Sequence, residues 1–275
     1  MNCFGRAPRL VLLALLGFGG GASVAQSFKD QLPPEMRIQR TSGDSIQPVF
    51  DGWQRYPDGT LSLWFSYYNR NSQEEVNVPV GPDNRFSDGV DHGQPAYFYP
   101  KRHQYVFRVN VPKDWGPDQK LIWTVTSRGE TCTAIGWLQP EWEVDDGVRQ
   151  MNAGGAGLAP PADPPNIAPK ITAGSSDQTV EFGKPVKLSV SATDDGIPKP
   201  RGPRGGLGIK WILYRGPAQV NFNPSESTPV YGKPLESTTE ATFSRPGSYW
   251  LQAIASDGLL DAVHNVKVTV NASQR

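Results

Sequence analysis

The chain has 275 residues and a mass of 30.1 kDa, enough for two domains of ordinary size. Its 27 Lys and Arg residues balance its 27 Asp and Glu residues, so no charge excess favours binding to nucleic acid or to an anionic membrane. The 29 Gly and 26 Pro residues, together with 10% aromatic residues, indicate a turn-rich, β-rich globular protein and exclude a disordered chain.

The N-terminal segment has the pattern of a secretory signal peptide. Arg6 and Arg9 precede a short apolar run at 10–16, and small residues lead to a cleavage site after Ala25. The apolar run is shorter than the about 20 residues that a membrane-spanning helix needs. No cysteine stands directly after the cleavage site, so no lipid anchor is indicated. We therefore expect residues 1–25 to be removed and the remaining chain to be periplasmic or secreted, without a membrane anchor.

Cys132 is the only cysteine expected after cleavage, because Cys3 lies in the signal peptide. No intramolecular disulfide is then expected, although export leads to an oxidising compartment. Cys132 lies within the strand-like segment 131–135, where a cysteine usually acts as a small buried apolar residue. The sequence therefore predicts a structural role for Cys132 and not a catalytic one.

Residues 26–151 are expected to form a β-sandwich domain of no recognised family. Apolar and polar residues alternate along 61–68, 105–111 and 121–125, which is the period of a half-buried strand. Turn sequences join neighbouring strands into hairpins, with Pro57-Asp58-Gly59 the first of them and Arg128-Gly129 another. Antiparallel hairpins without long amphipathic helices favour a sandwich over a βαβ nucleotide-binding fold. A short helix is predicted over 141–150.

A Gly/Pro-rich linker is predicted at 152–167, since its glycines and paired prolines fit neither a helix nor a strand ladder. The following residues, 168–275, again alternate with a period of two. Turn clusters at Asp194-Asp195-Gly196, Pro246-Gly247 and Ser256-Asp257-Gly258 have the spacing of an immunoglobulin-like sandwich. The expected fold is therefore all-β: two β-sandwich domains, the second immunoglobulin-like.

The C-terminal region resembles the PKD or cadherin-like Ig repeats of exported bacterial proteins. The resemblance covers roughly 168–272 and rests on Ala168-Pro169-Lys170-Ile171, Phe182-Gly183-Lys184-Pro185-Val186, Ala192-Thr193-Asp194-Asp195-Gly196, Trp211, Pro246-Gly247-Ser248-Tyr249 and Ala255-Ser256-Asp257-Gly258. In such a sandwich Trp211 is the central core tryptophan. Tyr249 is the corner tyrosine whose hydroxyl bonds back to the chain. Both roles are structural.

Asp194, Asp195 and Asp257 allow two interpretations. Loops after the second and sixth strands of an Ig-like sandwich approach each other at one end, so the three carboxylates could bind Ca²⁺. Asp-Gly is also a common turn dipeptide, because the aspartate side chain accepts hydrogen bonds from the nearby backbone. We favour turns and expect no metal or other cofactor.

No catalytic constellation is recognised. His92, His103 and His264 form no short-spaced ligand pair and are interpreted as surface or loop residues. The chain has no phosphate-binding glycine loop and no Gly-x-Ser-x-Gly elbow. The adjacent carboxylates at 74–75 and 145–146 are interpreted as solvated charge.

A row of aromatic side chains is the best sequence clue to a ligand. Trp64 and Tyr68 share one face of the predicted strand 61–69, opposite the expected core face. Such a row could stack on sugar rings or anchor a protein partner. The alternative is that a second sheet or the linker covers it.

We therefore predict an exported, non-enzymatic binding or assembly protein of the bacterial cell envelope, with a protein or glycan partner. The alternative is a carbohydrate-active protein whose first domain binds or cleaves glycan.

Overall fold

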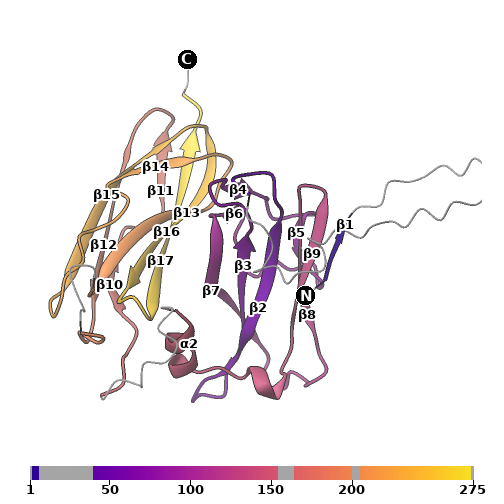
Figure 1. Ribbon diagram of the computed structural model, residues 1–275. Helices are drawn as coiled ribbons and strands as arrows, with labels where there is room; N and C mark the ends of the chain where they lie inside the picture. The colour runs from indigo at the N-terminus through magenta and orange to yellow at the C-terminus, as the bar shows by residue number, and fades with distance from the viewer. Residues whose placement is uncertain (1, 6–39, 154–163, 200–204, 274–275) are drawn as a thin grey trace, which may run out of the picture.

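A computed structural model describes residues 2–5, 40–153, 164–199 and 205–273. Its strands form two β-sandwich units. Among these residues α2 (Asp146–Ala153) is the one α-helix. Figure 1 shows the two units side by side, with α2 at the lower edge between them. The all-β sandwich fold expected from the alternating pattern is confirmed.

The N-terminal unit packs two sheets face to face. One sheet has the order β2-β3-β7, and the other has the order β1-β9-β8-β5. Phe65 of β3 and Trp123 of β8 lie in the shared core, where both side chains are fully buried. The elements are β1 (Asn2–Gly5), β2 (Ile46–Arg55), β3 (Leu61–Asn69), β5 (Asn84–Phe86), β7 (Lys101–Val111), β8 (Leu121–Ser127), β9 (Glu130–Gly136) and a separate pair, β4 (Val76–Asn77) and β6 (Tyr97–Phe98).

The predicted hairpins of this unit are confirmed. The β2–β3 turn closes through hydrogen bonds from the Tyr56 N–H to the Thr60 carbonyl and from the Gly59 N–H to the Tyr56 carbonyl. Gly59 has φ 82°, which a residue without a Cβ adopts readily. Arg128 and Gly129, with φ 52° and 78°, form the two-residue turn between β8 and β9.

The helix predicted over 141–150 is only partly correct. A 3-10 turn, η2 (Pro140–Trp142), comes first, and α2 begins later and ends beyond the predicted limit. Between them Glu143 is extended, and the Val144 N–H donates to the Trp53 carbonyl. This contact with β2 interrupts the helical pattern, because a backbone N–H used there cannot bond within a helix.

The C-terminal unit is an immunoglobulin-like sandwich. Its sheets have the orders β10-β12-β15-β14 and β11-β17-β16-β13, which correspond to the ABED and GFC sheets of that fold, with β11 added parallel to β17. The strands are β10 (Lys170–Gly174), β11 (Gln178–Glu181), β12 (Val186–Thr193), β13 (Gly208–Arg215), β14 (Val220–Asn223), β15 (Leu235–Phe243), β16 (Gly247–Ser256) and β17 (Asp261–Asn271).

The structural roles predicted for Trp211 and Tyr249 are confirmed. Trp211 on β13 is 2% exposed, and its indole N–H donates to Oγ of Ser237 at 3.2 Å. The Tyr249 hydroxyl donates to the Arg245 carbonyl at 2.7 Å, which is the tyrosine-corner bond. Trp211 therefore bonds to a side chain of the facing sheet, and Tyr249 bonds to the backbone beside its own strand.

Residues 1 and 6–25 of the predicted signal peptide, residues 26–39 of the predicted first domain and residues 154–163 of the predicted linker lie outside the described residues. Domain limits at 26–151, 152–167 and 168–275 stay predictions. One hydrophobic core lies wholly before 152, and the other lies after 167 except that Tyr97 and Tyr99 of the N-terminal unit pack into it. No helix among the described residues has both the length and the apolar character needed to cross a membrane.

Cys132 differs from expectation, because it is disulfide-bonded in the structure. β1 pairs with β9 so that Cys3 lies opposite Cys132 in the ladder. The expectation of no disulfide applies to a chain cleaved after Ala25, which would lack Cys3.

Candidate functional site

A loop of the N-terminal unit, residues 88–96, contacts the end of β13 in the C-terminal unit. The Arg215 guanidinium donates two hydrogen bonds to the Asp91 carboxylate, both at 2.7 Å, and a third to the Gln94 carbonyl at 2.7 Å. The Tyr214 hydroxyl donates to the Gly93 carbonyl at 2.6 Å. We call this set of contacts the junction.

The loop has the turn chemistry that presents Asp91 to Arg215. The Gly93 N–H donates to Oδ1 of Asp91 at 2.9 Å, and Gly93 itself has φ 84°. The hydrogen bonds from Arg215 hold the pKa of the Asp91 carboxyl below its ordinary value. Paired, planar Arg–carboxylate bonds of this kind fix orientation as well as distance.

A second contact between the units lies near α2. Arg149 is buried and lies over the Trp64 ring, with its guanidinium carbon 4.3 Å from the ring centroid. The same guanidinium faces Asp261 of β17 at 3.9 Å. The two units are therefore joined at two separate places.

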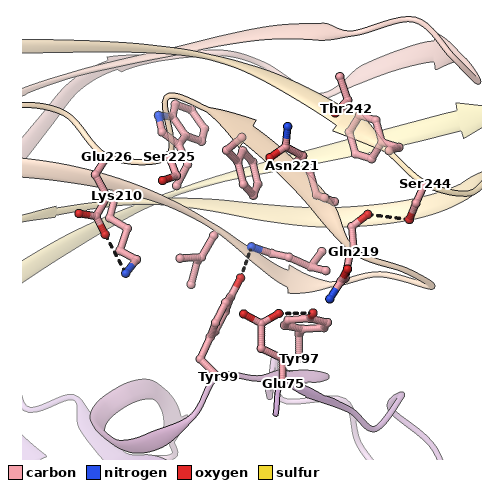
Figure 2. A pocket seen from close by; sticks show the side chains of 16 residues that line it. Glu75, Tyr97, Tyr99, Lys210, Gln219, Asn221, Ser225, Glu226, Thr242 and Ser244 are labelled. Carbon is pink, nitrogen blue, oxygen red and sulfur yellow. Dashed lines mark hydrogen bonds and ion pairs between the residues drawn. The ribbon is translucent and has the colours of Figure 1, made fainter. Parts of the chain in front are cut away.

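A groove with a volume of about 610 Å³ lies beside the junction. The N-terminal unit contributes Glu75, Tyr97 and Tyr99, and the C-terminal unit contributes residues from β13, β14, the end of β15 and the loops beside these strands. Figure 2 shows the three N-terminal side chains pointing toward β13 and β14. We call this feature the junction groove. It is the candidate functional site because both units form it.

Tyrosines close one side of the junction groove. The Leu213 N–H donates to the Tyr99 hydroxyl at 2.9 Å, and the Tyr97 hydroxyl donates to the Glu75 carboxylate at 2.5 Å. Burial raises the pKa of both tyrosine hydroxyls above the ordinary value, so both stay protonated at neutral pH. A protonated hydroxyl donates and accepts, which suits a polar ligand.

The opposite end of the junction groove combines an ion pair with stacked rings. Nζ of Lys210 lies 2.9 Å from the Glu226 carboxylate, at the surface. Deeper in, the half-buried Phe222 ring stacks on Trp211 with centroids 6.5 Å apart. The groove therefore offers charge, hydrogen-bonding groups and a limited apolar wall.

The structure does not support the aromatic row as a ligand platform. Trp64 and Tyr68 are each 7% exposed, and Arg149 covers the Trp64 ring. Both residues fit the alternative stated in the sequence analysis, in which the aromatic row is covered. Every residue of β3 is buried, because the second sheet packs on one face while α2 and Tyr105 cover part of the other.

The interpretation of the three histidines as surface or loop residues needs correction. His264 lies within β17, with its ring bonded to the Ser175 carbonyl, and His103 lies within β7, stacked on the Tyr67 ring at 4.9 Å. Neither is a loop residue. His92 does lie in a loop, where it pairs with Asp88. The alternating pattern predicted the last strand from Val266 onward, whereas β17 begins at Asp261 and so includes His264.

The three aspartates bond to nearby backbone. Oδ1 of Asp257 accepts from the N–H groups of Leu259 and Leu260, and Oδ2 of Asp194 accepts from the Gly196 N–H. Oδ1 of Asp195 accepts from the Ile197 N–H in the same way, whereas its Oδ2 accepts from the Ile167 N–H, 28 positions earlier in the chain. Within the described residues no group of three or more His, Cys, Asp or Glu side chains is placed to hold a metal. These bonds support the turn interpretation.

Sequence reasoning missed Asp91, Arg215, Tyr97 and Tyr99. The contact between Asp91 and Arg215 joins residues 124 positions apart, so no local pattern indicates it. The only available signal was the dense Tyr97-Phe98-Tyr99 run in a stretch without alternation.

No protein-family model matches the chain, and no curated protein matches it. Several solved structures are similar in part. The N-terminal Ig1-2 module of the Drosophila receptor protein tyrosine phosphatase DLAR has 13% identity and a TM-score of 0.30, over 83% of this chain and 100% of that one. Titin domains z1z2, solved in complex with telethonin, have 14% identity and a TM-score of 0.26, over 82% and 98%. Domains 4 and 5 of the S-layer protein SbsC have 13% identity and a TM-score of 0.25, over 55% and 66%.

Proposed function

We propose that the chain is an exported, non-enzymatic binding or assembly protein of the cell envelope, with the junction groove as its binding site. The observation that carries the proposal is the groove itself, which neither unit forms alone. Ligand sites lie preferentially between domains, where concave surfaces bring together groups from both sides.

Contacts between the units support a binding role, because they keep the walls of the groove in place before a ligand arrives. Arg215 and Tyr214 bond to residues 91–94 at the groove's flank. A site that needs no rearrangement binds with a smaller entropy cost. The PKD or cadherin-like resemblance of 168–272 and the signal-peptide pattern support export and envelope placement.

Burial weighs against the alternative of a carbohydrate-active protein. A sugar ring needs an accessible aromatic face, and Trp64 and Tyr68 do not provide one. The adjacent carboxylates of Asp145 and Asp146 are exposed at the start of α2 and do not line the junction groove.

Crosslinking in living cells tests the proposal. A photoreactive amino acid at the exposed groove residue Asn221 should give a discrete crosslinked product, whereas the same amino acid at exposed Lys187 on β12 should not. Intact mass of the recovered chain should place its N-terminus near Gln26. No product from Asn221, or equal products from both positions, would contradict the groove as a binding site.

A further inference from the structure

The junction groove lies between the end strands of two sheets. β13 ends the sheet β11-β17-β16-β13, and β14 ends the sheet β10-β12-β15-β14. Four consecutive residues line the groove from each side, 210–213 and 219–222. Since successive side chains of a strand point to opposite faces, a wall made of consecutive residues presents the edge of the strand.

The edge of β13 is already paired. The Ile209 N–H donates to Oγ of Ser227 at 2.9 Å, the Trp211 N–H donates to the Ser225 carbonyl at 2.8 Å, and the Leu213 N–H donates to the Tyr99 hydroxyl. Alternate N–H groups along this edge therefore have partners within the chain. An added strand would have to displace them.

The edge of β14 is different. β14 pairs with β15 on one side, and no strand of the described residues lies on its other side. In an antiparallel ladder, alternate residues direct both the N–H and the C=O away from the partner strand. An edge of this kind is a template for another strand.

We propose that the junction groove binds an extended polypeptide segment, which adds to β14 as a further strand. The inference rests on the proposed function, because it names the partner of that same groove. β14 has 4 residues, so the paired part of the ligand is about 13 Å long. Backbone bonds supply affinity in this mode, and the side-chain surroundings supply specificity.

The groove lining defines the side chains that suit this ligand. Phe222 and Val220 pack against the core from β14 and give an apolar wall. Exposed Glu75 accepts a bond from Tyr97 and has no ion pair with a cation of the described residues. The fitting segment alternates apolar and polar residues and carries a Lys or Arg where it passes Glu75.

A polypeptide fits better than a glycan. Tyr97 is 6% exposed and Trp211 is 2% exposed, so neither ring face is open to a sugar. The unpaired β14 edge, by contrast, offers donors and acceptors in strand spacing. A glycan is therefore a competing outcome of the experiment below.

Synthetic peptides test the proposal with the 275-residue chain. The probe is a 12-residue peptide of alternating Val and Ser with one central Lys. There are two matched control peptides. Each carries N-methyl groups on two alternate residues, and the methylated positions of the second control are shifted by one residue from those of the first. Only one phase faces β14, so one control should bind about tenfold more weakly, or weaker still, while the other binds nearly as the parent does.

Hydrogen exchange locates the binding. Amide exchange over 219–223 should slow when the parent peptide binds. Glu75→Gln should weaken binding of the Lys peptide about twofold to fivefold, whereas Glu236→Gln on the exposed side of β15 should not change it.

An equal loss of affinity for both N-methylated peptides would overturn strand addition. Slower amide exchange at residues other than 219–223 would also overturn it. Binding of cello-oligosaccharides or chitooligosaccharides that protects 219–223, without peptide binding, would overturn the peptide and leave the groove as a binding site. A crosslinked product at Asn221, with no binding by any of the peptides, would likewise overturn the peptide ligand and leave the groove as a binding site. Absence of the crosslinked product would instead contradict the proposed function.

Discussion

Replacement of Trp211 by alanine tests how the C-terminal unit is held together. The indole is almost fully buried, stacks against Phe222 and donates to Oγ of Ser237. Truncating a buried Trp to Ala costs about 3–5 kcal/mol. A typical domain is stable by about 5–15 kcal/mol, so Trp211→Ala should remove a large share of the stability of this unit.

The assay is differential scanning calorimetry with urea unfolding at pH 7. For a unit of this size each kcal/mol lowers the melting temperature by about 4 °C or more, which predicts a fall of at least about 12 °C. Trp142→Ala is the matched control, because that side chain is 40% exposed on η2. It should cost about 1 kcal/mol or less.

A second substitution keeps the test informative if Trp211→Ala fails to fold. Ser237→Ala removes only the acceptor of the indole N–H and should cost about 1–3 kcal/mol, because it leaves a buried donor unpaired. If Trp211→Ala were no more destabilising than Trp142→Ala, the assignment of Trp211 as the central core residue would be refuted.

Three further predictions concern single features. Tyr249→Phe should cost about 0.5–1.5 kcal/mol in urea unfolding through loss of the bond to the Arg245 carbonyl, and an unchanged midpoint would refute the corner role. Burial lowers the pKa of His103 below its ordinary value, so the unfolded chain binds the proton more readily. Stability should therefore fall from pH 7.5 to pH 5.5, and His103→Gln should reduce that fall. Millimolar Ca²⁺ should leave the melting midpoint unchanged in the wild type and in an Asp194→Asn, Asp257→Asn variant. A rise that the variant abolishes would contradict the turn interpretation.

Short-range patterns predicted the fold well where the physics is local. The alternation around Tyr249, the turn at 56–60 and the Asp-Gly corners each depend on neighbouring residues, and the structure contains them. Trp211 could be assigned because its place in an Ig-like sandwich follows from the order of strands.

The candidate site could not be predicted in the same way. Period-two alternation states which side chains share a face of a strand, but it does not state what covers that face. The pattern therefore left undecided whether Trp64 is exposed, and in the structure Arg149 from α2 covers it. The groove depends on Tyr99 meeting Leu213 across 114 positions, which is set by packing between the units.

The junction also changes what the residues between the units must do. Because Asp91 and Arg215 fix the placement of one unit against the other, that placement does not depend on the linker predicted at 152–167. Doubling the length of a closed loop costs only about 0.6 kcal/mol in closure entropy. Insertions there should be tolerated, and evolution or an engineer could place an additional module at this point without disturbing the groove.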